Sequence, residues 1–88
     1  MINYVYILKC RDNSLYCGYT NNLDKRLNYH NSGKASKYTR SRLPVRYIYI
    51  KAFNTKPQAL SYEYKIKQLS RTKKLKIISG NSKANSTN

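Results

Sequence analysis

The sequence predicts one small α+β domain, a three-stranded antiparallel sheet flanked by about three helices. The chain has 88 residues, which is enough for one domain with one modest core. Segments 3–9, 15–19 and 45–52 are rich in aromatic and branched residues and are typical of strands. Much of the remaining sequence has apolar residues at the three- and four-residue spacing of a helix. We expect the domain to span residues 1–79 and a disordered polar tail to span 80–88.

The first two strands are expected to form a hairpin whose register defines a candidate site. A five-residue loop, Cys10 to Ser14, has turn chemistry and places Gly18 opposite Tyr6. Tyr16 then lies beside Leu8 on the same face of the sheet. Glycine in a strand often marks close approach by a ligand or by another backbone. We therefore expect an open space beside the Tyr6 ring.

The first helix is expected to follow this hairpin. Asn21 is the expected N-cap, with Asp24 three residues later as in a capping box. Gly33 is expected to end the helix. Within the helix, Arg26 and His30 are four residues apart and share one stripe of its surface.

The second helix is expected to run from Thr55, with Pro57 in its first turn, to about Leu69. Glu63 lies within the apolar arc of this helix, and a buried carboxylate without a partner is costly. A structural salt bridge and a metal site are the two alternatives for it. A last short helix is expected to begin at Ser70.

The charge of the chain favours a polyanionic partner. Lys and Arg number 18 against three acidic residues, for a net charge of +15. Ten tyrosines accompany this charge, and they are suited either to stacking on bases or to ordinary strand positions. Residues 34–44 are expected to form a basic loop that contacts nucleic acid through Lys34, Lys37, Tyr38, Arg40 and Arg42. An anionic membrane is a weaker alternative, because no predicted helix sets a large apolar face against a basic one.

The two cysteines, Cys10 and Cys17, fall in or beside predicted strands. They are too few for a disulfide framework and are expected to be small buried side chains. No signal peptide or apolar span is recognised, so reduced thiols and a cytoplasmic location are the expectation.

The remaining chemistry-bearing residues form an ordered series. Tyr4-Val5-Tyr6, Tyr16-Cys17-Gly18, Arg26, His30 and Glu63 follow one another at characteristic distances. Over roughly residues 3 to 79 the chain resembles the GIY-YIG nuclease domain. The likeness is closest to the small single-domain bacterial proteins, which are related to the nuclease module of the excision-repair enzyme.

Three features depart from the family pattern. The first half-motif lacks its leading glycine, and Tyr19 stands where some nuclease members carry a lysine. The late asparagine of the family has no clear match, since Asn81 falls in the expected tail.

The resemblance implies a role for each residue of the series. Tyr6 would accept the proton of the attacking water, directly or as a phenolate. Its ordinary pKa is about 10, and the surrounding cations are expected to favour the ionised form. Tyr16 would position the water or the phosphate. Arg26 would bind the scissile phosphate, and His30 would act as proton relay or phosphate ligand.

Glu63 would hold one Mg²⁺ or Mn²⁺ ion, with waters in the remaining positions. Asp12 lies in a turn and Asp24 at a helix start, so both have local roles. A two-metal site needs several carboxylates, and this chain has too few for one.

The sequence therefore predicts a single-metal DNA endonuclease in repair or recombination, which recognises DNA by its structure or without specificity. One alternative is a basic module that binds DNA or RNA without cutting it. A further alternative is a basic protein associated with RNA or the ribosome.

Overall fold

The computed structural model describes residues 2–86, with side chains as far as Gly80. The elements are β1 (Asn3–Lys9), β2 (Leu15–Thr20), α1 (Leu23–Asn31), α2 (Lys37–Arg40), β3 (Arg46–Phe53), α3 (Lys56–Lys67) and α4 (Arg71–Ser86). The predicted α+β class and three-stranded antiparallel sheet are confirmed. The described residues form four helices rather than about three.

The sheet has the order β2-β1-β3, so β1 is the central strand and the other two are edges. Both pairings are antiparallel, and the predicted hairpin register is confirmed because Tyr6 pairs with Gly18 and Leu8 pairs with Tyr16. An irregularity in the β1–β3 pairing falls between Ile7 and Leu8. The central strand carries the most deeply buried residues of the sheet.

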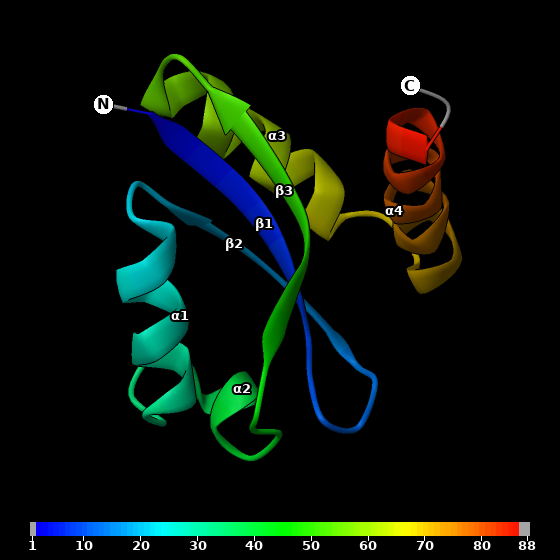
Figure 1. The fold of residues 1–88 in the computed structure, drawn as a ribbon. Coiled ribbons are helices and arrows are strands. Elements are labelled where there is room, and N and C mark those ends of the chain that lie inside the picture. Colours follow the sequence, from blue (N-terminus) through cyan, green and yellow to red (C-terminus); the bar gives the residue numbers. More distant parts are fainter. Residues whose placement is uncertain (1, 87–88) are drawn as a thin grey trace.

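Two hydrophobic clusters lie on the two faces of this sheet. Tyr6 and Leu8 pack with Leu27 of α1 on one face, whereas Ile7 packs with Ile66 of α3 on the other. This division follows from the alternation of side chains along β1. Figure 1 shows α1 and α2 to the left of the strands and α4 to the right. The residues of the candidate site thus lie on the face of the sheet that α1 covers, except for Glu63, which belongs to α3.

The expected open space at Gly18 is filled by the Tyr6 side chain, so this prediction was wrong. A Cβ atom built on Gly18 would collide with the Tyr6 hydroxyl and would stand 2.5 Å from its Cζ. The glycine is required by the tyrosine ring itself, because any larger residue would occupy the position of the phenol.

Gly18→Ala is expected to destabilise the domain by roughly 1–3 kcal/mol, because the overpacked ring or the strand must shift. Gly80→Ala is the matched control, since nothing lies within 4 Å of its added Cβ. In a helix that change should be neutral or stabilising by up to about 1 kcal/mol. Thermal melts followed by circular dichroism will compare the two, and equal melting temperatures would contradict the packing account.

Several helix boundaries differ from the sequence predictions. The N-cap of α1 is Asn22 rather than Asn21, because the Asn22 side chain accepts the backbone N–H of Lys25. The cap at Thr55 is confirmed by its bond from the Gln58 N–H. Gly33 follows α1 at φ +80, as expected of a helix-ending glycine.

The expected basic loop 34–44 contains the one-turn helix α2, which the sequence did not predict. Ser36 caps this helix by accepting the N–H of Tyr38. Thr39, on the inner side of the turn, is fully buried. The turn therefore buries the neutral Thr39 hydroxyl within a segment that is otherwise rich in Lys and Arg.

The backbone of α4 continues to Ser86, into the range 80–88 that the sequence assigns to a polar tail. Residues 87–88, and the side chains from 81 onward, lie outside the described residues. The disorder of this segment and the domain limit at residue 79 remain predictions. None of the described helices has the length and apolar character needed to span a membrane.

Both cysteines are unpaired and buried, as predicted. Burial raises the pKa of the Cys17 thiol to about 11.

Candidate active site

A chain of buried hydrogen bonds links the central strand to α1 and α2. The Tyr6 hydroxyl lies 2.9 Å from Nε2 of His30, and Nδ1 of His30 lies 3.0 Å from the Thr39 hydroxyl. Tyr6 is 2% exposed, His30 1% and Thr39 0%. The three side chains come from residues up to 33 positions apart, and only the packing of α1 and α2 on β1 brings them together.

The hydrogen bonds of this chain run in one direction. The Thr39 hydroxyl donates to the Ser36 carbonyl oxygen at 3.4 Å, so its oxygen is left to accept from Nδ1–H of His30. Nε2 is then the unprotonated nitrogen, and it accepts the Tyr6 O–H. The imidazole is thereby arranged to receive a proton that leaves Tyr6.

Tyr16 and Tyr47 enclose this pair. The Tyr16 ring meets the His30 ring edge-on, with centroids 5.2 Å apart, and the Tyr47 ring meets Tyr6 in the same manner at 5.3 Å. Tyr47 is fixed in turn by donating its hydroxyl to the Leu23 carbonyl oxygen at 2.7 Å. The pair is thus held between aromatic rings that restrict its orientation.

Burial raises the pKa of the Tyr6 phenol, and the nearby Tyr16 phenol raises it further. The Arg26 guanidinium lowers the pKa of Tyr6, but its effect is smaller than that of desolvation. The expectation that surrounding cations favour a phenolate was therefore wrong for this structure. Tyr6 is a neutral phenol at ordinary pH.

Burial also lowers the pKa of His30, and the Arg26 charge lowers it further. A neutral imidazole is the form that accepts the Tyr6 proton. The electrostatic environment and the hydrogen bonds around His30 therefore favour the same state.

The lowered pKa of His30 predicts a loss of stability in mild acid. Between the ordinary value of 6.5 and the lower folded value, the unfolded chain binds more protons than the folded one. The contribution of His30 to the free energy of unfolding should be fully present above pH 6.5 and should be lost as the pH drops through this range.

Chemical denaturation at several pH values between 8 and 5 will measure this loss. His30→Gln removes the titrating group and should flatten the dependence. If the free energy of unfolding falls with pH to the same extent in the parent and in this variant, His30 is not the source of the loss.

Arg26 is half-buried on α1 and lines an open hollow of about 240 Å³ beside Lys25 and Asn22. Its guanidinium lies 5.8 Å from the centre of the Tyr29 ring. Its charge affects the pKa of both Tyr6 and His30. Arg26 therefore lies within electrostatic reach of the buried tyrosine and histidine, and the hollow that it lines with Lys25 offers two cations to a phosphate group.

Glu63 comes from α3, on the other face of the sheet, and makes an ion pair with Lys67 at 3.1 Å. Its side chain is 16% exposed. The Glu63 charge still raises the pKa of Tyr6 and of Cys17 slightly, so the carboxylate lies within electrostatic reach of the site. The structural salt bridge is therefore present, and its partner was visible in the sequence as a Lys four residues later.

No cluster of three or more His, Cys, Asp or Glu side chains forms a metal site among the described residues. Glu63 alone could serve a divalent ion only of the kind that uses one or two carboxylates and fills its other positions with water and phosphate. Lys67 would have to release Glu63 for an ion to bind there.

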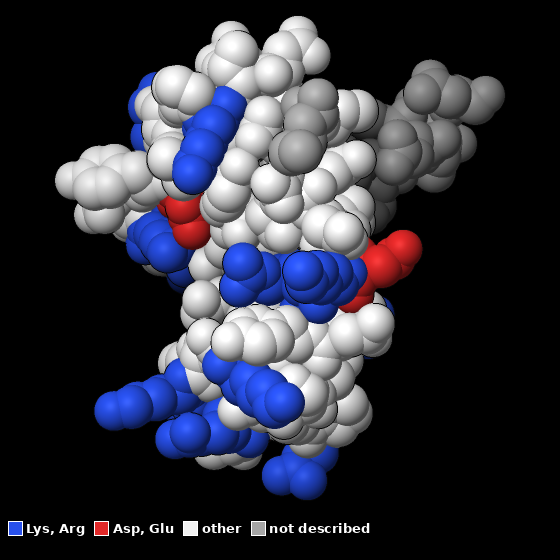
Figure 2. All heavy atoms as spheres, turned by 90° about the vertical axis from the view of Figure 1, so that its left-hand side faces the viewer, with Lys and Arg blue, Asp and Glu red and all other residues white. Residues whose placement is uncertain are grey.

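The residues expected to contact nucleic acid divide into two groups. Lys34, Lys37 and Arg40 are exposed. Arg42, in contrast, is engaged within the fold, because it pairs with Asp12 at 3.1 Å and lies 4.1 Å from the centre of the Tyr38 ring. Figure 2 shows the side of the molecule that carries α1, on which Lys and Arg atoms are widespread and acidic atoms few.

Sequence reasoning missed Thr39, Tyr47 and Lys67. Thr39 could have been noticed as a neutral residue between cations, three positions after Ser36, the residue that caps α2. Tyr47 could be read only as a strand residue, because its contact with Tyr6 depends on the β1–β3 register.

Comparisons with known proteins agree with this fold. The model of the GIY-YIG catalytic domain matches residues 2–76. A UPF0213 protein of Clostridium perfringens is 56% identical over 81 residues, covering 92% of this chain and 87% of the relative. A UPF0213 protein of Oceanobacillus iheyensis is 58% identical over 76 residues, covering 86% of this chain and 88% of the relative.

Solved structures show the same similarity. The NMR structure of a UPF0213 protein of Bacillus halodurans aligns with a TM-score of 0.60 and 49% identity, covering 90% of this chain and 84% of that one. The NMR structure of a protein of E. faecalis aligns with a TM-score of 0.65 and 37% identity, covering 93% and 88%. The chain belongs to the GIY-YIG family, whose domain is a nuclease domain.

Proposed function

We propose that this protein is a metal-dependent DNA endonuclease that hydrolyses phosphodiester bonds in the cytoplasm, in DNA repair or recombination. The observation that carries the proposal is the buried Tyr6–His30–Thr39 chain beside Arg26. A hydroxyl with an oriented proton acceptor next to a phosphate-binding cation is the arrangement that water-dependent phosphate cleavage requires.

In this proposal Tyr6 transfers a proton without becoming a phenolate. The attacking water gives its proton to the Tyr6 oxygen as the Tyr6 O–H proton passes to Nε2 of His30. The raised pKa of Tyr6 is then no obstacle, because the phenol is neutral before and after the transfer. Tyr16, in contact with His30, positions the water or the phosphate.

Arg26 binds the scissile phosphate and stabilises the charge that develops on its oxygens. Glu63 would hold a single Mg²⁺ or Mn²⁺ ion, which when bound supplies further neutralisation of the phosphoryl group. Lys67, now paired with Glu63, would remain nearby as an additional cation.

DNA is the proposed substrate, with Lys34, Lys37, Tyr38, Arg40 and Arg42 at the nucleic-acid interface. No separate recognition module is evident among the described elements. Recognition is therefore proposed to be structure-specific or non-specific.

Binding to DNA should depend strongly on salt. If about four to six phosphates are neutralised, log affinity should fall against log salt with a slope of roughly −4 to −5. Fluorescence anisotropy across a range of salt concentrations will measure the slope. An affinity that is constant between low and moderate salt would contradict the electrostatic account.

A non-catalytic module that binds DNA or RNA is the second candidate. Two observations favour it: Tyr6 is 2% exposed, and the Glu63 carboxylate is engaged by Lys67. The two candidates differ in whether the phosphodiester bond is cut.

End-labelled DNA and RNA of one sequence, incubated with the protein and Mg²⁺, will test the proposal. The proposal predicts cleavage of DNA. Cleavage of RNA alone would contradict it, and salt-sensitive binding without cleavage of either strand would select the second candidate.

A further inference from the structure

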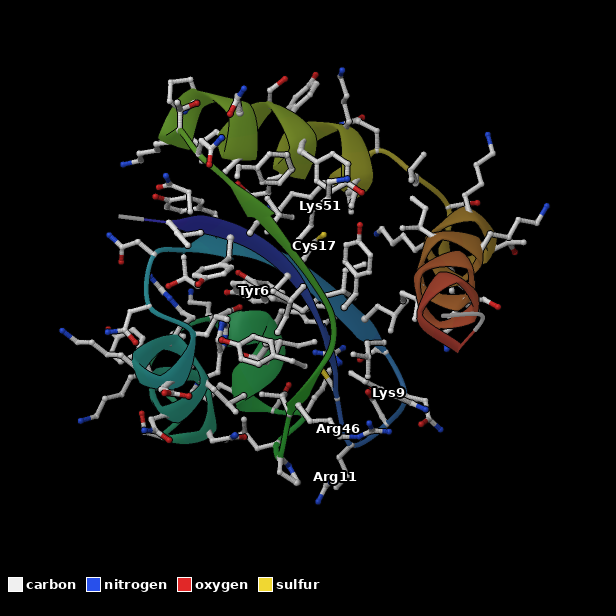
Figure 3. The ribbon with its side chains drawn as sticks, turned by 45° about the horizontal axis from the view of Figure 1, so that its top comes forward. Tyr6, Lys9, Arg11, Cys17, Arg46 and Lys51 are labelled. Atoms are coloured by element: carbon white, nitrogen blue, oxygen red, sulfur yellow. The ribbon has the colours of Figure 1, made fainter. Side chains whose placement is uncertain are left out.

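A second concentration of positive charge lies at the end of the sheet where β1 ends and β3 begins. Lys9, Arg11 and Arg46 surround an open hollow of about 360 Å³, whose floor includes the buried Cys10 and Val45. We call it the β3-edge hollow. Figure 3 shows the three cations following one another along this end of the sheet, below Tyr6.

Two of these cations are direct cross-strand partners, since Lys9 pairs with Arg46. Like charges at directly opposed positions of a sheet destabilise it. The neighbouring Asp12 does not relieve the repulsion, because its carboxylate is bound by Ser14 and Arg42. Within residues 2–80 the three cations make no salt bridge. An anionic ligand is therefore the natural source of neutralisation.

The hollow is built on ordered backbone. The Arg11 N–H donates to the Arg42 carbonyl oxygen, and the Cys10 N–H donates to the Ser14 carbonyl oxygen, each at 2.9 Å. The backbone at Cys10 and Arg11 is thus fixed. The guanidinium groups of Arg11 and Arg46, which both line the hollow, suit the oxygens of phosphate groups.

The β3-edge hollow and the hollow beside Arg26 lie toward opposite ends of β1. Thr20, which lines the Arg26 hollow, pairs with Tyr4 at the start of β1, whereas Lys9 and Arg46 pair with each other at its end. By alternation along β1, the Lys9 side chain points to the face opposite Tyr6 and Leu8.

We propose that the β3-edge hollow binds the phosphate backbone of a second duplex DNA segment while the active site engages the first. The identity of this ligand rests on the proposed function. A lipid surface suits the hollow less well, because none of the large exposed apolar side chains among residues 2–80 lines it.

A capture experiment tests this inference without cleavage. One duplex is immobilised, the protein is added in chelator, and retention of a second, labelled duplex is measured. The test variant is Lys9→Gln/Arg46→Gln. The matched control is Lys73→Gln/Lys76→Gln, which removes the same charge from exposed positions of α4. Circular dichroism verifies that both fold.

The parent and the control are expected to retain the labelled duplex, and the test variant to retain it at least about tenfold less. Equal capture by the test variant, or an equal loss in both variants, would overturn the inference. Preferential capture of an RNA duplex would overturn the choice of DNA. If the parent captures DNA in this manner but does not nick it with Mg²⁺, the nuclease proposal fails and the second site stands.

Discussion

Tyr6→Phe is expected to lower the rate of DNA cleavage by roughly two to four orders of magnitude, with DNA affinity close to that of the parent. The change removes only the hydroxyl that donates to Nε2 of His30, so it ends proton transfer and leaves the cationic surface intact. His30 would lose one buried partner, at a cost of about 1–3 kcal/mol in stability.

Tyr47→Phe is the matched control. It also removes a hydroxyl, from a tyrosine whose ring packs edge-on against Tyr6, but that hydroxyl donates to the Leu23 carbonyl oxygen. Its loss should reduce the melting temperature and leave the cleavage rate near the parent value. Single-turnover cleavage and equilibrium binding will separate the two effects. If Tyr6→Phe cleaves DNA as fast as Tyr47→Phe and the parent, Tyr6 is not the proton carrier.

Glu63→Gln is expected to lower turnover by at least about a hundredfold, because the charge stabilisation that a metal ion provides is lost. DNA affinity should hold or rise slightly, since one negative charge is removed and Lys67 is freed from its pair. Asp24→Asn makes the same change of charge in the first turn of α1 and should leave turnover unchanged. Arg26→Ala should differ from both by weakening binding and turnover together.

Kinetics and affinity are to be measured at a temperature well below the melting temperature of every variant. Near-normal cutting by Glu63→Gln in a reaction that chelator still inhibits would mean that the metal binds elsewhere. The role assigned to Glu63 would then be wrong.

The hairpin register was predictable because it depends on local chemistry. A turn of fixed length and the two-residue alternation of strands are enough to place Gly18 opposite Tyr6. The filling of that position was not predictable, because the direction of the Tyr6 ring depends on His30, which α1 supplies. Alternation indicates the face of the sheet but does not place a side chain within it.

The protonation state of Tyr6 was predicted wrongly for a related reason. Net charge along the sequence indicated a cationic environment, but the pKa of a buried group depends first on desolvation. Burial at the centre of the sheet is a tertiary property. The helix α2 escaped prediction because its single turn is stabilised by a Ser36 cap and by the burial of Thr39, neither of which gives helical periodicity.

The central claim is that this protein cuts the DNA backbone with the help of one divalent ion. Its most direct test is the conversion of supercoiled plasmid to nicked circle at fixed protein concentration, with Mg²⁺ or Mn²⁺ removed by chelator and then restored. The account predicts nicking that appears with the ion, disappears with chelator and returns on restoration. Salt-sensitive DNA binding with no nicking at any concentration of either ion would contradict it.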